Sequence, residues 1–275
     1  MFPLSTTSSP TGRSQLGFTL IEMVVTMVIV GILGVGITNF IGRSVQGYSD
    51  TAERQQLATI AWIVSEKVTR ELRGALPNSI SLSSGNTCIG IIPIAAGSDY
   101  LSVPIATASN TFEVVPFSNY DNADVSGERA AIYPNTLTNL YSLSNPGMIS
   151  DLVDNLSAGT TTGAITVNLD STHRFITDSP TKRVYMVQNP ITYCFESGGF
   201  LYRYSGYGFQ QALPSNGFTR TVVGSNLSNG LFAYTAGTLS RSGVITLSFN
   251  VVGDNTGGNA TSHPIAQEVQ IRNVP

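Results

Sequence analysis

The sequence is poor in charged residues and in histidine. Charged side chains make up 11% of the 275 residues and the net charge is −3, so nothing indicates a basic surface for nucleic acid. The two histidines, His173 and His263, lie in no metal-binding spacing such as HExxH, and neither a GxSxG nucleophile motif nor a paired-acid motif is present. We therefore expect no enzyme: no catalytic residues, no cofactor, no metal site and no nucleic-acid partner.

Cysteine is equally scarce, with two residues, Cys88 and Cys194. Outside the cytoplasm an isolated pair most simply forms one disulfide. Such a bond would close a loop of about 100 residues and contribute on the order of 4–5 kcal/mol in the chain-entropy model. The alternative is a catalytic thiol or a metal-binding pair, but no histidine motif accompanies either cysteine. We expect the disulfide.

One long stretch has no charged residue and no proline. Residues 23–42 read MVVTMVIVGILGVGITNFIG, and a helix of this length can cross a bilayer core of about 30 Å. The charge at the start of this apolar block is Glu22, and a lone carboxylate in lipid costs a few kcal/mol and suggests a partner. A secretory signal peptide has a shorter apolar core and an A-x-A-like cleavage site. A simple membrane anchor would leave Gly17 and Glu22 unexplained.

The residues before this run carry a motif. Gly17-Phe18-Thr19-Leu20-Ile21-Glu22, followed by about twenty apolar residues, resembles the class III signal of type IV pilins and type II secretion pseudopilins. The resemblance implies that a prepilin peptidase cleaves after Gly17 and that the new N-terminal residue, Phe18, is methylated. It also implies that Glu22 faces the terminal amine of a neighbouring subunit and sets its register. An amine and a carboxylate can offset each other's burial.

The pattern after the apolar run predicts that the helix continues into water. Gly74 and Pro77 mark its end, so one helix from Phe18 to near Ala75 is expected. Its second half has an apolar face with spacings of three and four residues: Leu57, Ile60, Ala61, Val64, Val68, Leu72 and Ala75. The expected organisation is a leader (1–17), a transmembrane and assembly helix (18–42), an amphipathic half-helix (43–76) and a β-rich extracytoplasmic domain (77–275).

The remaining chain predicts short strands separated by Gly, Asn, Ser and Pro. The fold class expected is therefore α+β and type IV pilin-like, with a long N-terminal α-helix packed on an antiparallel β-sheet domain. Residues 118–160 are rich in Asn and Ser and predict a long loop or insertion. The clearest hairpin is 193–196, turn 197–199 and 200–204. The strands expected are 88–92, 111–117, 129–133, 165–169, 183–187, 191–196, 200–204, 219–223, 244–251 and 265–271.

Several short blocks resemble the MshO-type minor pilins of the mannose-sensitive haemagglutinin (MSHA) pilus system. They are residues 54–57, 69–79, 183–187, 193–195, 201–204 and 267–275. This resemblance implies a minor pilin in pilus biogenesis, in an initiation or tip complex. It implies these partners: the prepilin peptidase, other minor and major pilins, an inner-membrane assembly platform and membrane lipid. The precursor would be a single-pass inner-membrane protein with a periplasmic domain, and the assembled subunit would lie in a pilus at the cell surface.

Two other functions compete with this one. A J-type minor pseudopilin of a type II secretion system shares the Arg-Glu-Leu-Arg end of the helix at residues 70–73. A filament-borne adhesin would use its β domain to bind a ligand, and the aromatic cluster Tyr202, Tyr204, Tyr207 and Phe209 could stack on one, although alternating aromatics more often fill a sheet face. Oxygen-rich loops at Asp121/Asp124 and at Asp254 could hold calcium, but turn chemistry explains them more simply.

Overall fold

The computed structural model describes residues 17–125, 127–212, 216–237, 241–253 and 262–271. The chain divides into two compact units, Met1–Glu53 and Arg54–Pro275. Helix α1 (Leu20–Arg73) begins in the first unit and ends in the second. The leader expected at residues 1–17 lies outside the described residues except for Gly17.

In the first unit, the side chains of α1 from Leu20 to Ala52 are exposed. The hydroxyl groups in its apolar stretch donate to backbone carbonyls one turn earlier: Thr26 to Met23 at 2.9 Å, Thr38 to Gly34 at 2.6 Å and Ser44 to Phe40 at 2.9 Å. Each hydroxyl is therefore satisfied within the helix, as an apolar solvent requires. Among the described residues, α1 is the helix whose length and apolar composition suffice to cross a bilayer.

In the second unit, the last five turns of α1 present an apolar stripe to the core. Leu57, Ala61, Val64, Val68 and Leu72 are buried there. Ile60 packs against the same core while half-exposed, and Ala75 is buried just beyond the helix. The amphipathic face expected from the sequence is confirmed. The helix ends at Arg73, two residues before the expected end, with Gly74 donating its backbone N–H to the Glu71 carbonyl at 3.1 Å.

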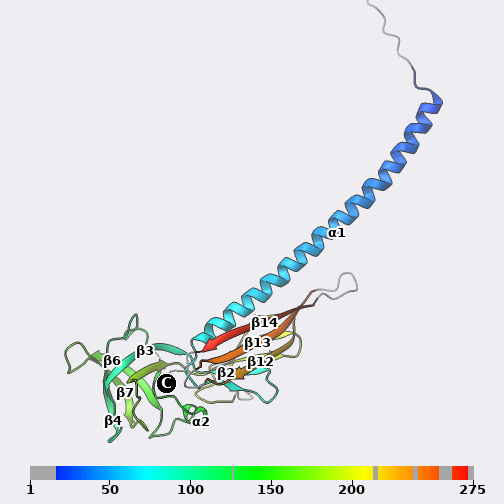
Figure 1. The fold of residues 1–275 in the computed structure, drawn as a ribbon. Coiled ribbons are helices and arrows are strands. Elements are labelled where there is room, and N and C mark those ends of the chain that lie inside the picture. Colours follow the sequence, from blue (N-terminus) through cyan, green and yellow to red (C-terminus); the bar gives the residue numbers. More distant parts are fainter. Residues whose placement is uncertain (1–16, 126, 213–215, 238–240, 254–261, 272–275) are drawn as a thin grey trace, which may run out of the picture. The chain divides into compact units, whose positions relative to one another are not determined.

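Two antiparallel sheets complete this core (Figure 1). A five-stranded sheet has the order β1-β2-β9-β10-β11, and a three-stranded sheet has the order β12-β13-β14. The long helix and the antiparallel sheets confirm the expected α+β, pilin-like class. The strands are β1 (Ser81–Leu82), β2 (Cys88–Ile91), β9 (Ile191–Glu196), β10 (Phe200–Ser205), β11 (Thr219–Gly224), β12 (Leu227–Thr235), β13 (Gly243–Val252) and β14 (Ser262–Ile271).

A closed six-stranded barrel is formed by the chain between β2 and β9, with the strand order β3-β4-β7-β6-β5-β8. Its first and last strands pair with each other, with Ile94 opposite Val187, and Gln188 donates its backbone N–H to the Pro93 carbonyl at 3.0 Å. The barrel therefore starts and ends at one place and has a core of its own. Its elements are β3 (Ile94–Ser102), β4 (Ser109–Val114), β5 (Arg129–Ile132), α2 (Leu137–Leu140), β6 (Ile149–Ala158), β7 (Ile165–His173) and β8 (Arg183–Val187).

Residues 118–160 were expected to be a long loop or an insertion. The loop is wrong, because β5, α2 and β6 lie there, and these elements belong to the barrel inserted between β2 and β9. The buried residues of strand β6 do not alternate with exposed ones, so the sequence lacks the period of two that identifies a strand. Its buried residues include Ser150, Val153 and Leu156, three apart, because a register shift interrupts the pairing with β7 between Val153 and Asn155. Its polar residues are paired across the strands, as where the Asn168 side-chain amide donates to the Asn155 side-chain oxygen at 2.8 Å.

The ten expected strands each overlap an observed one, and β1, β3, β6 and β12 were not foreseen. Irregular pairing explains β12 as well as β6. A register shift lies between Ser228 and Leu231, and Asn229 has a φ of +52°. A Cβ at Gly230 would lie 2.1 Å from a ring carbon of Phe195, so glycine is required there by the close approach of that ring.

Candidate functional site

The start of helix α1 is a capped helix terminus. Thr19 is the last residue before the helix, and its hydroxyl oxygen accepts the backbone N–H of Glu22 at 3.4 Å. Its carbonyl accepts the N–H of Met23 at 3.2 Å. Thr19 and Glu22 have the spacing of a capping box. Thr19 was not singled out from the sequence, although the Thr-x-x-Glu signal could have identified it.

The expected cleavage site lies just outside this cap. Gly17 and Phe18 precede the helix in irregular backbone, and the Phe18 side chain is 78% exposed. The bond between them is therefore not protected by helical hydrogen bonds. Cleavage there would leave the new amine two residues before the first residue of α1 and four residues before Glu22. Processing at Gly17 and methylation of Phe18 stay predictions.

Glu22 carries the charge at the head of the apolar run. Among the described residues its carboxylate forms no ion pair. A carboxylate in the first turn is favoured by the helix dipole, but this does not offset its desolvation in lipid. Its local position therefore suits a charge that is paired by a group from outside the chain.

The apolar half of the same helix contains five glycines. A Cβ added at the glycines of the run would meet no atom of this chain within 4 Å; they are Gly31, Gly34, Gly36, Gly42 and Gly47. Packing within the chain therefore does not require glycine at these positions, and each lowers helix propensity by up to about 1 kcal/mol relative to alanine. Small residues allow close approach of neighbouring helices in a bilayer, which gives them a use in a multi-chain assembly.

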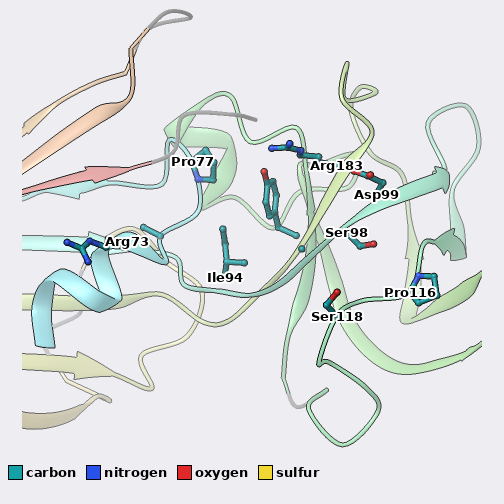
Figure 2. Close-up of a pocket in the computed structure, with 11 residues that line it drawn as sticks. Arg73, Pro77, Ile94, Ser98, Asp99, Pro116, Ser118 and Arg183 are labelled. Carbon is teal, nitrogen blue, oxygen red and sulfur yellow. The ribbon is translucent and has the colours of Figure 1, made fainter. Parts of the chain in front are cut away.

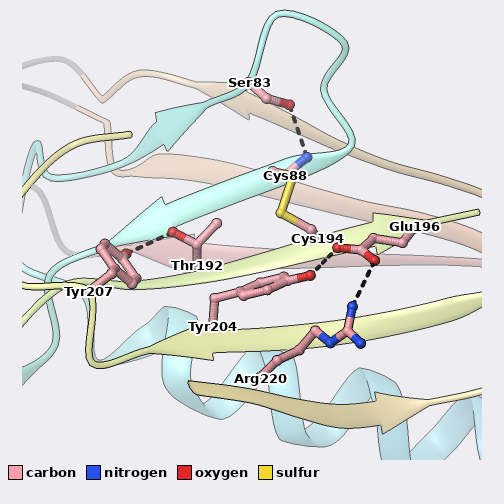
Figure 3. The surroundings of a disulfide bond; sticks show 8 residues. All are labelled: Ser83, Cys88, Thr192, Cys194, Glu196, Tyr204, Tyr207 and Arg220. Atoms are coloured by element: carbon pink, nitrogen blue, oxygen red, sulfur yellow. Dashed lines mark hydrogen bonds and ion pairs between the residues drawn. A yellow bond between two sulfur atoms is a disulfide. The ribbon is translucent and has the colours of Figure 1, made fainter. Parts of the chain in front are cut away.

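Cys88 and Cys194, the pair expected to bond, are joined by a disulfide (Figure 3). They lie opposite each other on β2 and β9, so the bond ties the strand before the barrel to the strand after it. Ser83 accepts the backbone N–H of Cys88 at 3.0 Å through its hydroxyl oxygen. The bond therefore fixes the point where the barrel is inserted into the five-stranded sheet.

The aromatic residues considered for ligand binding fill space around this disulfide. Tyr204 and Tyr207 are buried beside Cys194, and Tyr202 and Phe218 pack against them. The Tyr204 hydroxyl donates to Glu196, and the Thr192 and Tyr207 hydroxyls are 2.8 Å apart (Figure 3). Phe209 is directed elsewhere, with its ring 6.2 Å from that of Tyr141. These aromatics form sheet packing and not an open stacking platform.

The other residues considered for chemistry have local structural partners. His173 is buried, and its Nε2 is 3.3 Å from the Gly147 carbonyl oxygen. Asp121 and Asp124 cap one turn, since the backbone N–H of Asp121 donates to Asp124 at 2.9 Å. Asp254, the other calcium candidate, lies outside the described residues. Among the described residues no group of three or more His, Cys, Asp and Glu side chains is arranged for a metal ion.

One charged contact joins α1 to the five-stranded sheet. The Arg203 Nε lies 2.9 Å and 3.2 Å from the two carboxylate oxygens of Glu71. Burial, and then the neighbouring Glu71 carboxylate, raise the pKa of the adjacent Tyr193 hydroxyl. Two residues of the Arg-Glu-Leu-Arg block that suggested a subfamily therefore have a structural role: Glu71 joins the helix end to β10, and Leu72 is buried in the core.

Comparison with protein families finds one match. The model described as "Prokaryotic N-terminal methylation motif" covers residues 12–38. No characterised protein and no solved structure matches the chain. The motif is type IV pilin-like and supports a pilin or pseudopilin subunit. It implies processing by a prepilin peptidase and assembly with other pilins, and together with the apolar helix it fits a membrane-anchored pilin.

Proposed function

We propose that this chain is a minor pilin of a type IV pilus of the MSHA type, cleaved between Gly17 and Phe18 and then assembled through α1. Glu22 carries the proposal. It is the charge at the head of an apolar run, follows a capped start and has no ion-pair partner among the described residues. An N-terminal amine of a neighbouring subunit would be a fitting partner, because two buried opposite charges are tolerated far better than one.

Exposed apolar residues further along α1 support an assembly role. Trp62, the single tryptophan, is 68% exposed and Ile63 is 46% exposed. Both lie off the stripe that packs on the core. Large apolar side chains on a helix face indicate contact with another protein or with lipid. In the proposed filament they would contact neighbouring subunits.

The size of the chain and the resemblance of its short blocks to MSHA-system minor pilins support the minor role. The 275-residue chain would keep 258 residues after loss of residues 1–17, and major pilins are usually much shorter. We place the subunit in an initiation or tip complex, below at least one other subunit, because retention of Glu22 has a purpose only if a neighbouring amine reaches it. The proposed role is structural and not catalytic. Its partners would be other pilins, the prepilin peptidase, the inner-membrane platform and lipid.

Replacement of Glu22 tests the proposal. We expect Glu22→Ala to lower the amount of this subunit in sheared filaments by at least about tenfold, because loss of one member of a buried charge pair costs several kcal/mol. The amount in the membrane fraction should not change. Immunoblots of both fractions measure this.

Glu66→Ala is the matched control, since Glu66 is an exposed glutamate on the same helix. It should leave incorporation unchanged. Normal incorporation of Glu22→Ala, or an equal loss in both variants, would contradict a registry role for Glu22.

The second candidate is a J-type pseudopilin, favoured by the same motif. Deletion of the gene separates the two: loss of surface filaments with normal protein secretion supports the pilus, and loss of secretion alone supports the pseudopilin.

A further inference from the structure

A pocket of about 510 Å³ lies where the barrel meets the chain segment that follows α1. Four segments line it: the end of α1 with residues 75 and 77, strand β3, the loop after β4, and strand β8. This volume is within the range of small-molecule and cofactor sites. Figure 2 shows Arg73 at one end of the lining and Arg183 and Asp99 toward the other, with Ile94 between them.

The positive charges of the two arginines in this pocket are not paired with a carboxylate among the described residues. Among the described residues, neither Arg73 nor Arg183 forms an ion pair or a side-chain hydrogen bond, and both are exposed. Asp99 is opposite Arg183 in the pairing of β3 with β8, but the two do not form an ion pair. Three other arginines are paired with carboxylates: Arg129, Arg203 and Arg220. The pocket therefore offers two guanidinium groups that can each take a carboxylate or sulfate.

An aromatic ring is held in the same pocket. Tyr185 on β8 is opposite Gly97 on β3, and a Cβ at Gly97 would lie 3.4 Å from a carbon of the Tyr185 ring. The ring therefore lies over the glycine, against the β3 backbone. Pro77 and Pro116 add two apolar rings to the lining. An aromatic ring and apolar side chains with a few polar groups are the lining that binds and orients an organic ligand.

An extended peptide is a poorer fit than a saccharide. Peptides commonly bind to an open strand edge through main-chain hydrogen bonds. Here β3 pairs with both β4 and β8, and β8 pairs with both β3 and β5, so both strands of the lining have neighbours on each side. The pocket thus offers two separated guanidinium groups, one carboxylate (Asp99), hydroxyls and one aromatic ring without a free strand edge.

We propose that this pocket binds an acidic oligosaccharide, with Arg73 and Arg183 each holding an anionic group on a different sugar unit and Tyr185 contacting a sugar face. The shared chemistry is a carboxylate or sulfate carried on a pyranose chain. The residues required belong to the second unit alone. The pocket would bind in this way whether or not the chain assembles into a filament.

Isothermal titration of the full chain in detergent micelles tests the pocket. The probes are oligogalacturonate, which carries carboxylates, a heparin-derived oligosaccharide, which carries sulfates, a neutral maltooligosaccharide and oligoglutamate. We expect at least one acidic saccharide to bind, and added salt to weaken it. Arg73→Gln and Arg183→Gln should each weaken binding by about tenfold or more, because each removes a charge-assisted contact. The stronger of the two acidic probes identifies the anionic group.

Two control variants each lose one positive charge close in sequence to a pocket arginine. Arg70→Gln and Lys182→Gln alter exposed residues that are close in sequence to Arg73 and Arg183 but do not line the pocket, and each should change affinity by less than about twofold. Formation of the Cys88–Cys194 disulfide reports that each variant is folded. Three results would overturn the proposal: no binding of either acidic saccharide, equal weakening by the control variants, or oligoglutamate binding as tightly as the saccharides.

Discussion

In the apolar half of α1, some polar side chains have a hydrogen-bond partner within the helix, whereas the carboxylate of Glu22 has no ion-pair partner among the described residues. The hydroxyls of Thr26, Thr38 and Ser44 donate to carbonyls of their own helix, so each is compatible with lipid. Glu22 has no corresponding partner among the described residues. An ionised side chain in a spanning segment usually marks function. The contrast between hydroxyls and carboxylate is therefore the residue-level basis of the assembly role.

His173 should make the barrel sensitive to acid. Burial lowers the pKa of this imidazole, partly opposed by the Gly147 carbonyl and by Asp151. The unfolded chain, in which His titrates near the ordinary value of about 6.5, then binds a proton more readily than the folded chain. This part of the stability is present above that value and is lost as the pH falls below it.

We expect His173→Gln to lose less stability than the parent chain between pH 7 and pH 5. The difference should not exceed about 1.4 kcal/mol per pH unit, the slope for one proton. Urea unfolding at both pH values measures it. Parallel pH profiles for the two chains would contradict a buried neutral imidazole.

The Glu71–Arg203 pair should couple α1 to β10. Both side chains are about one-third exposed or less, at 31% and 27%, and two carboxylate oxygens lie within 3.2 Å of the Arg203 Nε. A double-mutant cycle with Glu71→Gln and Arg203→Gln, followed by urea unfolding, should give a coupling of about 1 kcal/mol. Additive effects of the two substitutions would show that the contact contributes nothing as a pair.

Among the elements, α1 and the hairpin of β9 and β10 could be predicted from sequence because their patterns are regular. The stripe from Leu57 to Leu72 keeps helical spacing, and the turn at residues 197–199 has two glycines with positive φ, Gly198 and Gly199. Strands β6 and β12 could not be predicted, because register shifts break their alternation. The pocket could not be predicted for another reason: Arg73 at the end of α1 and Arg183 on β8 are 110 residues apart in sequence and line one pocket only in the folded chain.

We expect that the barrel can be deleted without preventing the two sheets and α1 from folding. Its first and last strands pair at Ile94 and Val187, so a two-residue Asn-Gly turn joining these residues replaces residues 95–186 with hairpin geometry. We expect the shortened chain to form the Cys88–Cys194 disulfide and to enter filaments, while losing the acidic-oligosaccharide binding. Its melting temperature should fall, because Leu76 and Ile92 pack against barrel residues.

The control for this deletion is the parent chain analysed in parallel by non-reducing electrophoresis and by filament shearing. Failure of the shortened chain to form the disulfide would show that the barrel is needed to fold the sheets. A folded, membrane-inserted chain that no longer enters filaments would assign the barrel a direct role in assembly.

At the scale of the whole molecule, the chain joins an N-terminal methylation motif, which is shared by many pilin-like proteins, to a larger β-rich unit. The methylation motif covers residues 12–38, while the second unit contains two sheets, a disulfide and a barrel. The motif and the apolar run could be identified from sequence because they are continuous in the chain. The barrel could not, because its closure depends on strand pairs that are far apart in sequence, such as Ile94 with Val187.

Intact mass and N-terminal sequencing of the chain, from cells with and without the prepilin peptidase, test the proposed processing most directly. In cells that have the enzyme, we predict a mature protein that begins at N-methylated Phe18. In cells without it, the chain should begin at Met1 and be absent from filaments. A chain that begins at Met1 in both strains would contradict the account and would reduce the apolar half of α1 to an ordinary membrane anchor.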